Sequence, residues 1–304
     1  MSLVVNTNVA SMNAQRSLAS SGKELQTAME RLSTGKRINS AADDAAGFAI
    51  AESMTAQIRG LSMASKNASD AIGLLRVVEN ATNDVTDMLQ RIRELAVQAQ
   101  SGTNSTSDIS NLQQEANALI DEIDRVSSDT KYNGVAYIGS EKGTKNIQVG
   151  YNDGDSIAIT TYDVGADKLG VMVNDASTAS PTDDKVLVAL KKADGTYLDI
   201  SQTVTAEAGT TNKIPGALEV ITGAINQVAG YKASWGAGQN RLEYTVSNLM
   251  NVVEFTTAAR SRIQDADFAM EAAKLAKAQV LQQTGTAMLA QANAAPQLAL
   301  QLIK

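Results

Sequence analysis

Apolar side chains recur at helical spacing over a long stretch in the first third of the chain. Between Ser40 and about Gln100 no proline interrupts the sequence. Apolar or small residues there are mostly three, four or seven residues apart, at Ile58, Leu61, Ala68, Ile72, Leu75, Val85, Leu89, Ile92 and Ala96. This spacing places them on one face of an α-helix. It predicts a single helix of about 55 to 60 residues, roughly 85 Å long at 1.5 Å per residue.

Two shorter stripes repeat the same spacing further along the chain. After a turn-rich segment, 101–108, the first stripe consists of Leu112, Ala116, Leu119, Ile123 and Val126. Near the other end, the second consists of Leu242, Val246, Leu249 and Val253, with Pro215 and Gly216 upstream as a helix start. Three such stripes can bury one another. We therefore expect a long coiled-coil-like rod built from both ends of the chain.

Between these helical arms the apolar pattern changes to period two. Ile147 and Val149, a turn at 152–154, and then Ile157 and Ile159 predict a β-hairpin. The segment 185–201 predicts a second hairpin, with strands on either side of an Ala-Asp-Gly turn at 193–195. The expected fold is mainly α, with a β-hairpin and a small, β-rich inserted outer domain.

The segment 32–52 contains a glycine beside two cations, followed by two adjacent aspartates. Gly35 suits the residue after a helix end, where Arg37 would meet the negative end of the helix dipole. Ser40 and Asp43 have the spacing of a capping box that starts the next helix. These four residues predict a joint between a terminal helix and the long helix.

Two chemical interpretations of the same segment fail on spacing. A phosphate-binding P-loop needs a glycine five residues before Gly35 and a Ser or Thr after the lysine, and those positions hold Glu30 and Arg37. Asp43 and Asp44 are adjacent, so on a helix they point about 100° apart and do not share one divalent ion. We therefore expect no phosphate or metal site here.

Both ends of the chain are almost free of charge. Residues 281–303 contain no charged side chain, and residues 1–22 contain only Arg16, in a chain that is 19% charged. Five glutamines in 281–303 make the segment too polar for lipid. Such a surface suits burial against other protein, so we expect a polymer in which the ends of many copies pack together. The expected assembly residues are Val5, Val9, Met12, Leu18, Leu25, Leu32, Leu281, Met288, Leu289, Leu298 and Leu302.

Composition excludes several classes of function. The chain has neither cysteine nor histidine, which removes thiolate nucleophiles, histidine bases and the common zinc sites. We expect no enzyme and no catalytic, cofactor-binding or metal-binding residue. The net charge of −7 argues against a nucleic-acid surface. The first residues lack the basic and apolar regions of a cleaved signal peptide, and no membrane insertion is expected.

Several long motifs resemble one family, the bacterial flagellins. ERLSTGKRINSAADDAAGFAIAE, LQRIRELAVQAQSGT and EIDRVSSDTKYNGV resemble the N-terminal part of flagellins. GAGQNRLEYTVSNL and the run from ARSRIQDADFAMEAAKLAKAQ to the last residue resemble their C-terminal part. The resemblance covers roughly residues 1–160 and 216–304, and it does not extend to the segment 171–214.

The resemblance implies a structural subunit that self-assembles into the helical flagellar filament, the propeller of swimming motility. It implies an extracellular protein, exported by the flagellar type III system. Its implied partners are copies of itself or sister flagellins, an export chaperone, the filament cap and the hook–filament junction proteins. The implied domains are terminal helices in the inner core, 1–39 and 264–304; a rod, 40–170 and 215–263; and a variable outer domain, 171–214.

Two further sets of residues follow from the resemblance. The vertebrate Toll-like receptor for flagellin recognises the LQRIRELAVQ motif and the facing helix, which implies contacts at Gln90, Arg91, Leu95 and Glu115. Arg91 and Glu115 have a purely structural alternative, as a salt bridge between helices or subunits. By analogy with glycosylated relatives, candidate O-glycosylation sites are Ser177, Thr178, Ser180, Thr205 and Thr210.

Two alternatives to a filament subunit remain at this point. The hook–filament junction proteins resemble flagellins at both ends but act as adaptors that do not grow long filaments. An enzyme would have to rely on carboxylates and lysine alone. Self-assembly separates the first alternative from a filament subunit, and turnover by the purified monomer would support the second.

Overall fold

The computed structural model describes residues 7–174, 185–192, 194–203, 205–206 and 213–301. The chain forms two compact units. One contains residues up to 59 and from 251 onward, and the other contains residues 60–250. Each unit is described separately below.

Five helices account for most of the described residues, as the apolar spacing predicted. Their bounds are α1 Val9–Thr34, α2 Ala45–Ala99, α3 Thr106–Asp129, α4 Ala217–Gln264 and α5 Phe268–Gln301. The long helix α2 has 55 residues, within the predicted length. It is uninterrupted because its sequence contains no proline and is rich in alanine and leucine, which favour the helical backbone.

The strands form three small antiparallel pairs. Their bounds are β1 Gly143–Gln148, β2 Ser156–Thr161, β3 Gly170–Asn174, β4 Lys185–Ala189, β5 Thr205–Ala206 and β6 Lys213–Ile214. The first predicted hairpin is confirmed: β1 pairs with β2, with Ile147 opposite Ile157. Gly154 supplies the positive φ of the connecting turn, 89°. The fold is thus mainly α with a small β part.

The second predicted hairpin forms beside its turn but does not extend along β4. Across the turn, Lys192 N–H donates to Thr196 O and Leu198 N–H donates to Leu190 O, with a bridge between Lys191 and Tyr197. β4 itself pairs with β3, with Gly170 opposite Ala189. A strand that lies earlier in the chain takes the β4 edge, and a pairing of that kind leaves no mark in the local alternation.

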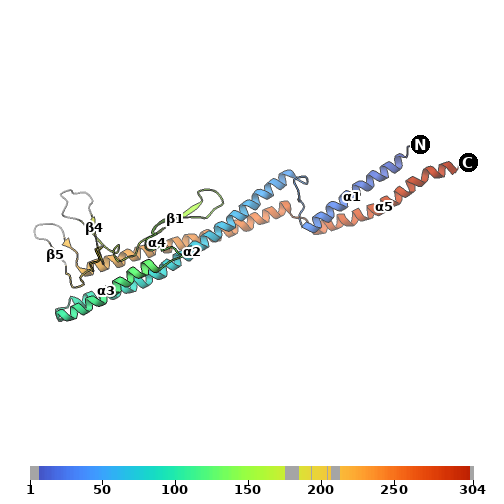
Figure 1. The fold of residues 1–304 in the computed structure, drawn as a ribbon. Helices are drawn as coiled ribbons and strands as arrows, with labels where there is room; N and C mark the ends of the chain where they lie inside the picture. Colours follow the sequence, from blue (N-terminus) through green and yellow to red (C-terminus); the bar gives the residue numbers. More distant parts are fainter. Residues whose placement is uncertain (1–6, 175–184, 193, 204, 207–212, 302–304) are drawn as a thin grey trace. The chain divides into compact units, whose positions relative to one another are not determined.

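The core of the unit 60–250 lies between three helices. Here α2, α3 and α4 run side by side (Figure 1). The predicted stripes are the buried faces: Leu89 and Ile92 of α2 and Ile123 of α3 are completely buried, as is Leu242 of α4. Apolar burial between the three helices therefore stabilises this unit, at roughly 25 cal/mol per Å².

An aromatic cluster fastens the hairpin β1–β2 to α4. The rings of Tyr162 and Tyr231 stack with their centroids 4.1 Å apart, and Trp235 lies beside both. The indole N–H of Trp235 donates to Thr160 O of β2 at 2.9 Å, so this buried side chain has its polar atom satisfied.

Candidate assembly surface

α1 and α5 form an antiparallel pair that is held by short side chains. Buried residues at the contact include Ser11, Ser21 and Ala28 of α1 and Ala278 of α5. The face of α1 toward α5 repeats at 11, 14, 18, 21, 25, 28 and 32, all buried or half-buried. Small residues allow two helices to approach closely but bury little apolar area. The pair therefore covers only one stripe of each helix.

Polar side chains at the N-terminal end of α1 bind the pair together. Asn8 caps α1 by accepting from Ser11 N–H at 3.0 Å, and its amide also donates to Ala292 O at 2.7 Å. The Ser11 hydroxyl and Asn293 Oδ1 lie 2.7 Å apart. These contacts were not predictable from the sequence, because uncharged amides and hydroxyls have no characteristic spacing.

A charged contact holds the other end of the pair. The carboxylate of Glu271 is buried, and it accepts from Lys274 Nζ at 2.7 Å and from Arg31 Nη1 at 3.4 Å. The hydrogen bond from Lys274 lowers the pKa of Glu271 below its ordinary value of 4.5. The carboxylate therefore stays ionised at neutral pH and links α5 to α1. The burial of Glu271 was not predicted from the sequence, because a single glutamate on a helix is usually exposed to solvent.

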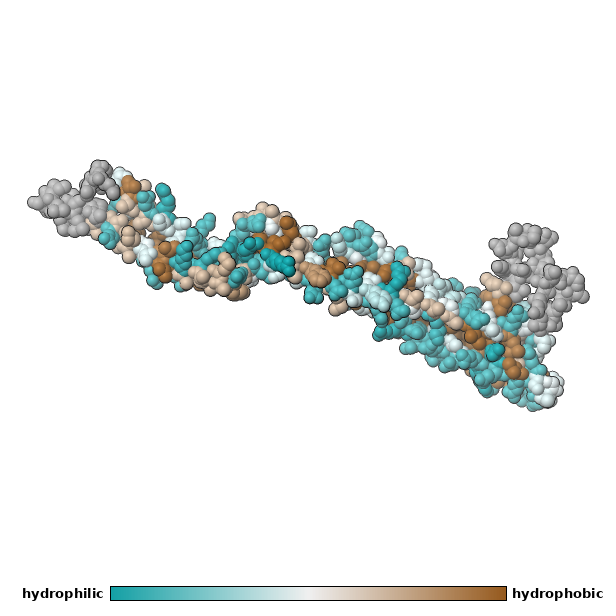
Figure 2. All heavy atoms as spheres, turned by 180° about the vertical axis from the view of Figure 1, so that it is seen from behind, coloured by the Kyte–Doolittle hydropathy of each residue, from teal (hydrophilic) through white to brown (hydrophobic). Residues whose placement is uncertain are grey.

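Much of the apolar surface of the pair is left uncovered. Of the predicted assembly residues, Val9, Met12, Leu281 and Met288 are exposed, while Leu18, Leu25, Leu32 and Leu289 are half-buried at or near the contact. Leu298 lies in the α5 backbone, and Val5 and Leu302 lie outside the described residues. Figure 2 shows apolar residues at the surface of the face that it draws.

A groove runs along one side of the pair as two adjoining hollows of about 550 Å³ each. Both hollows are lined by Ser20 and Glu24, so they are continuous. One hollow is cationic and is lined by Lys23, Arg31, Lys274 and Lys277. Apart from Glu24, the other is uncharged, and its lining residues include Ala10, Asn13, Ser17, Gly285 and Met288.

The predicted joint is a clasp between two segments far apart in the chain. Gly35 ends α1 in the left-handed conformation, φ 72°, and its N–H donates to Arg31 O. Its carbonyl accepts from Ala266 N–H at 2.9 Å. The Arg37 guanidinium donates to Ile263 O and the Arg37 N–H to Gln264 O, both at 2.6 Å. The joint thus fixes the end of α4 against the end of α1.

The capping box predicted at Ser40 and Asp43 is corrected by the structure. α2 begins at Ala45, and Asp44 is the residue whose carboxylate accepts from Gly47 N–H, at 3.0 Å. Asp43 instead accepts from Ser40 N–H at 2.9 Å and closes a turn before the helix. The backbone hydrogen bond from Ser40 lowers the pKa of Asp43. The helix starts later because Asp44 satisfies one of its first free N–H groups, that of Gly47.

The residues implied for receptor contact lie on α2 and α3. Gln90, Arg91 and Glu115 are exposed, and Arg91 Nη2 lies 2.8 Å from Glu115 Oε1 across the two helices. The Glu115 hydrogen bond raises the pKa of Arg91. Leu95 is different: its side chain is 1% exposed and belongs to the core. The contact implied at Leu95 therefore stays a prediction, at a side chain that faces the core of the unit.

Most of the candidate O-glycosylation sites lie in the segment 171–214 outside the described residues. Ser177, Thr178, Ser180 and Thr210 lie outside the described residues, and Thr205 is in the β5 backbone.

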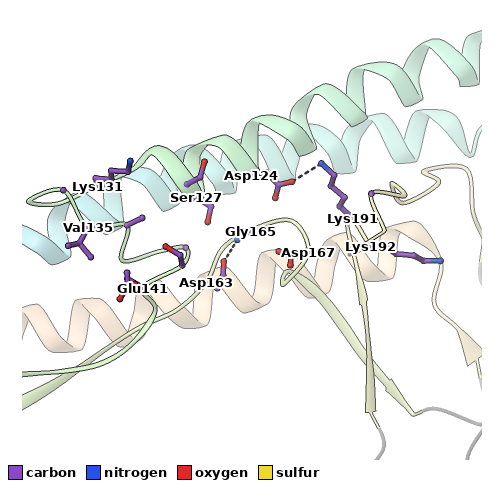
Figure 3. A pocket seen from close by; sticks show the side chains of 16 residues that line it. Asp124, Ser127, Lys131, Val135, Glu141, Asp163, Gly165, Asp167, Lys191 and Lys192 are labelled. Carbon is purple, nitrogen blue, oxygen red and sulfur yellow. Dashed lines mark hydrogen bonds and ion pairs between the residues drawn. The ribbon is translucent and has the colours of Figure 1, made fainter.

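Another hollow, of about 850 Å³, lies in the unit 60–250, among α3, the loops around β1 and β2, and the residues after β4 (Figure 3). Asp124 accepts from Lys191 Nζ at 3.2 Å and from Ala166 N–H at 2.8 Å. Asp163 accepts from Lys142 Nζ at 2.8 Å and from Gly165 N–H at 3.0 Å. Asp124 holds two loops to α3 and Asp163 joins the segment before β1 to the loop after β2, so their observed role is structural.

None of the helices in the described part of the chain is long and apolar enough to cross a membrane. Within the same part of the chain, no group of three or more acidic side chains is placed to hold a metal ion.

Two family models match the chain. The bacterial flagellin N-terminal helical region matches residues 5–138, and the bacterial flagellin C-terminal helical region matches residues 218–303. Together they cover more than half of the sequence and leave the middle segment unmatched. The matched residues contain all of α1, α2, α3 and α5, and all of α4 except its first residue.

Similar curated proteins carry the name flagellin, which does not favour the junction adaptor. A flagellin of Bacillus subtilis (strain 168) is 42% identical, with 99% of each chain covered. Those of Xenorhabdus nematophila and Serratia marcescens are 41% and 39% identical, with both chains fully covered. The crystal structure of Bacillus cereus flagellin is 23% identical with a TM-score of 0.43, and covers 60% of this chain and 88% of that one. The chain therefore belongs to the bacterial flagellin family, the structural subunits that polymerise into the extracellular flagellar filament.

Proposed function

We propose that this subunit polymerises by burying the uncharged surfaces of α1 and α5 against those of other copies. The observation that carries the proposal is the apolar surface that the pair leaves uncovered. Val9, Met12, Val280, Leu281 and Met288 are all at least 42% exposed, on segments almost without charge. Burial of such side chains between copies removes apolar area from water, which favours association.

We propose a matching division of labour along the chain. The terminal segments 1–39 and 264–304 form the inner core, the segments 40–170 and 215–263 form the rod, and 171–214 faces outward. The clasp at the joint supports the inner boundary, because residues on both sides of Gly35 bind residues on both sides of Gln264. Its role is to hold the terminal pair in a fixed direction relative to the adjoining ends of α2 and α4.

The test is seeded polymerisation of the full chain, observed by electron microscopy with sheared filament fragments as seeds. We expect long helical tubes from the parent chain. Leu281→Glu places one charge on the exposed side of α5 and is expected to abolish elongation. Thr203→Glu adds the same charge to an exposed residue of 171–214 and is expected to elongate normally. Equal elongation by the two variants would show that α5 is not buried in the filament.

We further propose that the chain is exported unfolded by the flagellar type III system, with the export chaperone, cap and hook–filament junction proteins as its partners. The support is membership of the family. A strain without the flagellar export apparatus should retain the chain inside the cell. Normal secretion by such a strain would refute this route.

A second proposed role is recognition by the vertebrate flagellin-sensing Toll-like receptor, at Gln90, Arg91 and Glu115. The supporting observation is that these polar side chains are exposed together on α2 and α3. Reporter cells treated with an Arg91→Ala variant test it, and a full response would leave the ion pair with a structural role only.

A further inference from the structure

The terminal helix pair exposes oxidisable sulfur. Met12 and Met29 of α1 are 52% and 55% exposed, and Met270 and Met288 of α5 are 59% and 62% exposed. The chain has no cysteine, so methionine is its only sulfur-containing side chain. A thioether is flexible and polarizable, and it packs well in irregular apolar contacts until it is oxidised.

Met12 and Met288 lie on different sides of the pair. Met288 lines the uncharged hollow, together with Ala10, Asn13 and Ser17 of α1. Those three residues are three or four apart and share one side of α1. Met12 precedes Asn13 by one residue, so it points about 100° away from that side. One side of the pair thus carries a projecting thioether, and another side carries a hollow lined mainly by small side chains.

This arrangement fits a second copy of the same chain. A projecting group and a hollow on different sides make a head-to-tail contact, which continues from copy to copy and does not close as a two-fold dimer would. An open series of that kind is what a helical filament requires. The hollow of about 550 Å³ has room for an unbranched side chain. Apart from Glu24, its lining residues are uncharged.

We propose that Met12 and Met288 lie at contacts between copies in the filament, and that their oxidation to sulfoxides by a peroxide blocks subunit addition. The inference rests on the proposed assembly through α1 and α5, and it identifies a chemical modification that regulates that surface.

The chemistry needs only the oxidant. A sulfur lone pair attacks one peroxide oxygen, the O–O bond breaks, an S–O bond forms, and water leaves after proton transfer. Methionine is oxidised by two electrons and the peroxide is reduced by two. The product is a polar sulfoxide, whose burial without a hydrogen-bond donor is costly. An oxidised copy should therefore add to a filament end more slowly than an unoxidised one.

The first experiment is oxidative footprinting of the wild-type chain. Free subunits and filaments are exposed to the same hydrogen peroxide concentration, and sulfoxide formation at each methionine is followed by peptide mass spectrometry. We expect Met12 and Met288 to oxidise at least about tenfold more slowly in the filament, because susceptibility follows exposure. Met172, which is 62% exposed on β3, serves as the internal control and should oxidise at similar rates in both.

The second experiment compares seeded elongation before and after oxidation. We expect oxidised wild-type subunits to elongate at least about tenfold more slowly than unoxidised ones, and methionine sulfoxide reductase to restore the rate. In the double variant Met12→Leu, Met288→Leu, the ratio of the two rates should approach one, because leucine has no sulfur. Met172→Leu, the matched control, should keep the wild-type ratio.

The outcomes distinguish failure of this inference from failure of the proposed assembly through α1 and α5. If filaments form but Met12 and Met288 oxidise as fast as in free subunits, or if oxidised subunits elongate normally, the inference is wrong and the proposed assembly stands. If Leu281→Glu elongates normally, assembly through α5 is wrong and the inference fails with it. Protection at both methionines together with loss of sensitivity in the double variant supports it.

Discussion

Replacing Leu95 with alanine tests whether this residue acts through the fold or through direct contact. Its side chain is 1% exposed and packs in the three-helix core. Truncating such a leucine costs about 2–5 kcal/mol of unfolding free energy, from lost apolar burial and the cavity left behind. With a urea dependence of roughly 2 kcal/mol per molar, the unfolding midpoint should fall by about 1–2.5 M.

The assay pairs this variant with a surface one. Urea unfolding is followed by circular dichroism at 222 nm, and receptor signalling is measured in reporter cells with the same samples. Arg91→Ala should leave the midpoint unchanged, because its ion pairs with Glu115 and Glu94 are exposed. It should nevertheless reduce signalling. Leu95→Met, which conserves volume, should cost less than about 1.5 kcal/mol and keep signalling.

One result would refute the reasoning from burial. If Leu95→Ala unfolds at the wild-type midpoint and still loses signalling, the side chain contacts the receptor directly, despite its burial in the free subunit. If Arg91→Ala instead lowers the midpoint as strongly as Leu95→Ala, the ion pair to Glu115 is a structural element of the rod, and the proposed receptor role loses its support.

Three further predictions follow from particular contacts. The pKa of Glu271 is lowered below 4.5, so its ionised form stabilises the α1–α5 contact at neutral pH and this stabilisation is lost as pH falls below 4.5. Light scattering of filaments from pH 6 to 3 should therefore fall less steeply for Glu271→Gln than for the parent chain. At Gly170 an added Cβ would lie 2.0 Å from Val188 O, so Gly170→Ala should open the β3–β4 pair to proteolysis, whereas Gly102→Ala, with open space around it, should not. Backbone amides of α5 should exchange rapidly in the free subunit, where few of its side chains are buried, and slowly in filaments; strong protection before assembly would contradict this.

The helices were predictable because their spacing repeats over many residues. The stripes through Leu89 and Ile123 leave little choice of face, and these residues are buried as expected. The burial of Leu95 follows the same rule, since it lies three residues after the buried Ile92. The resemblance implied a receptor contact at Leu95, and the apolar spacing implied that its side chain is buried. In the structure the side chain is buried.

Helix starts were less predictable because one local pattern has two outcomes. Ser40 and Asp43 have the same S-x-x-D spacing as Ser105 and Asp108. At 105–108 the pattern forms a true capping box, at the start of α3. At 40–43 it only closes a turn, because Asp44 caps the helix that follows. The partner of β4 was out of reach for another reason, since pairing between distant strands depends on how the intervening chain packs.

The clasp at the joint also affects when the α1–α5 pair can form during folding of the chain. The hydrogen bond from Arg37 to Ile263 O joins residues that are 226 positions apart. Closing so long a loop is costly until the intervening unit has folded. In a chain that does not yet include α5, the helix α1 has no partner. The α1–α5 pair therefore does not form on such a chain. If polymerisation uses this pair, as proposed, a chain without α5 cannot join a growing polymer.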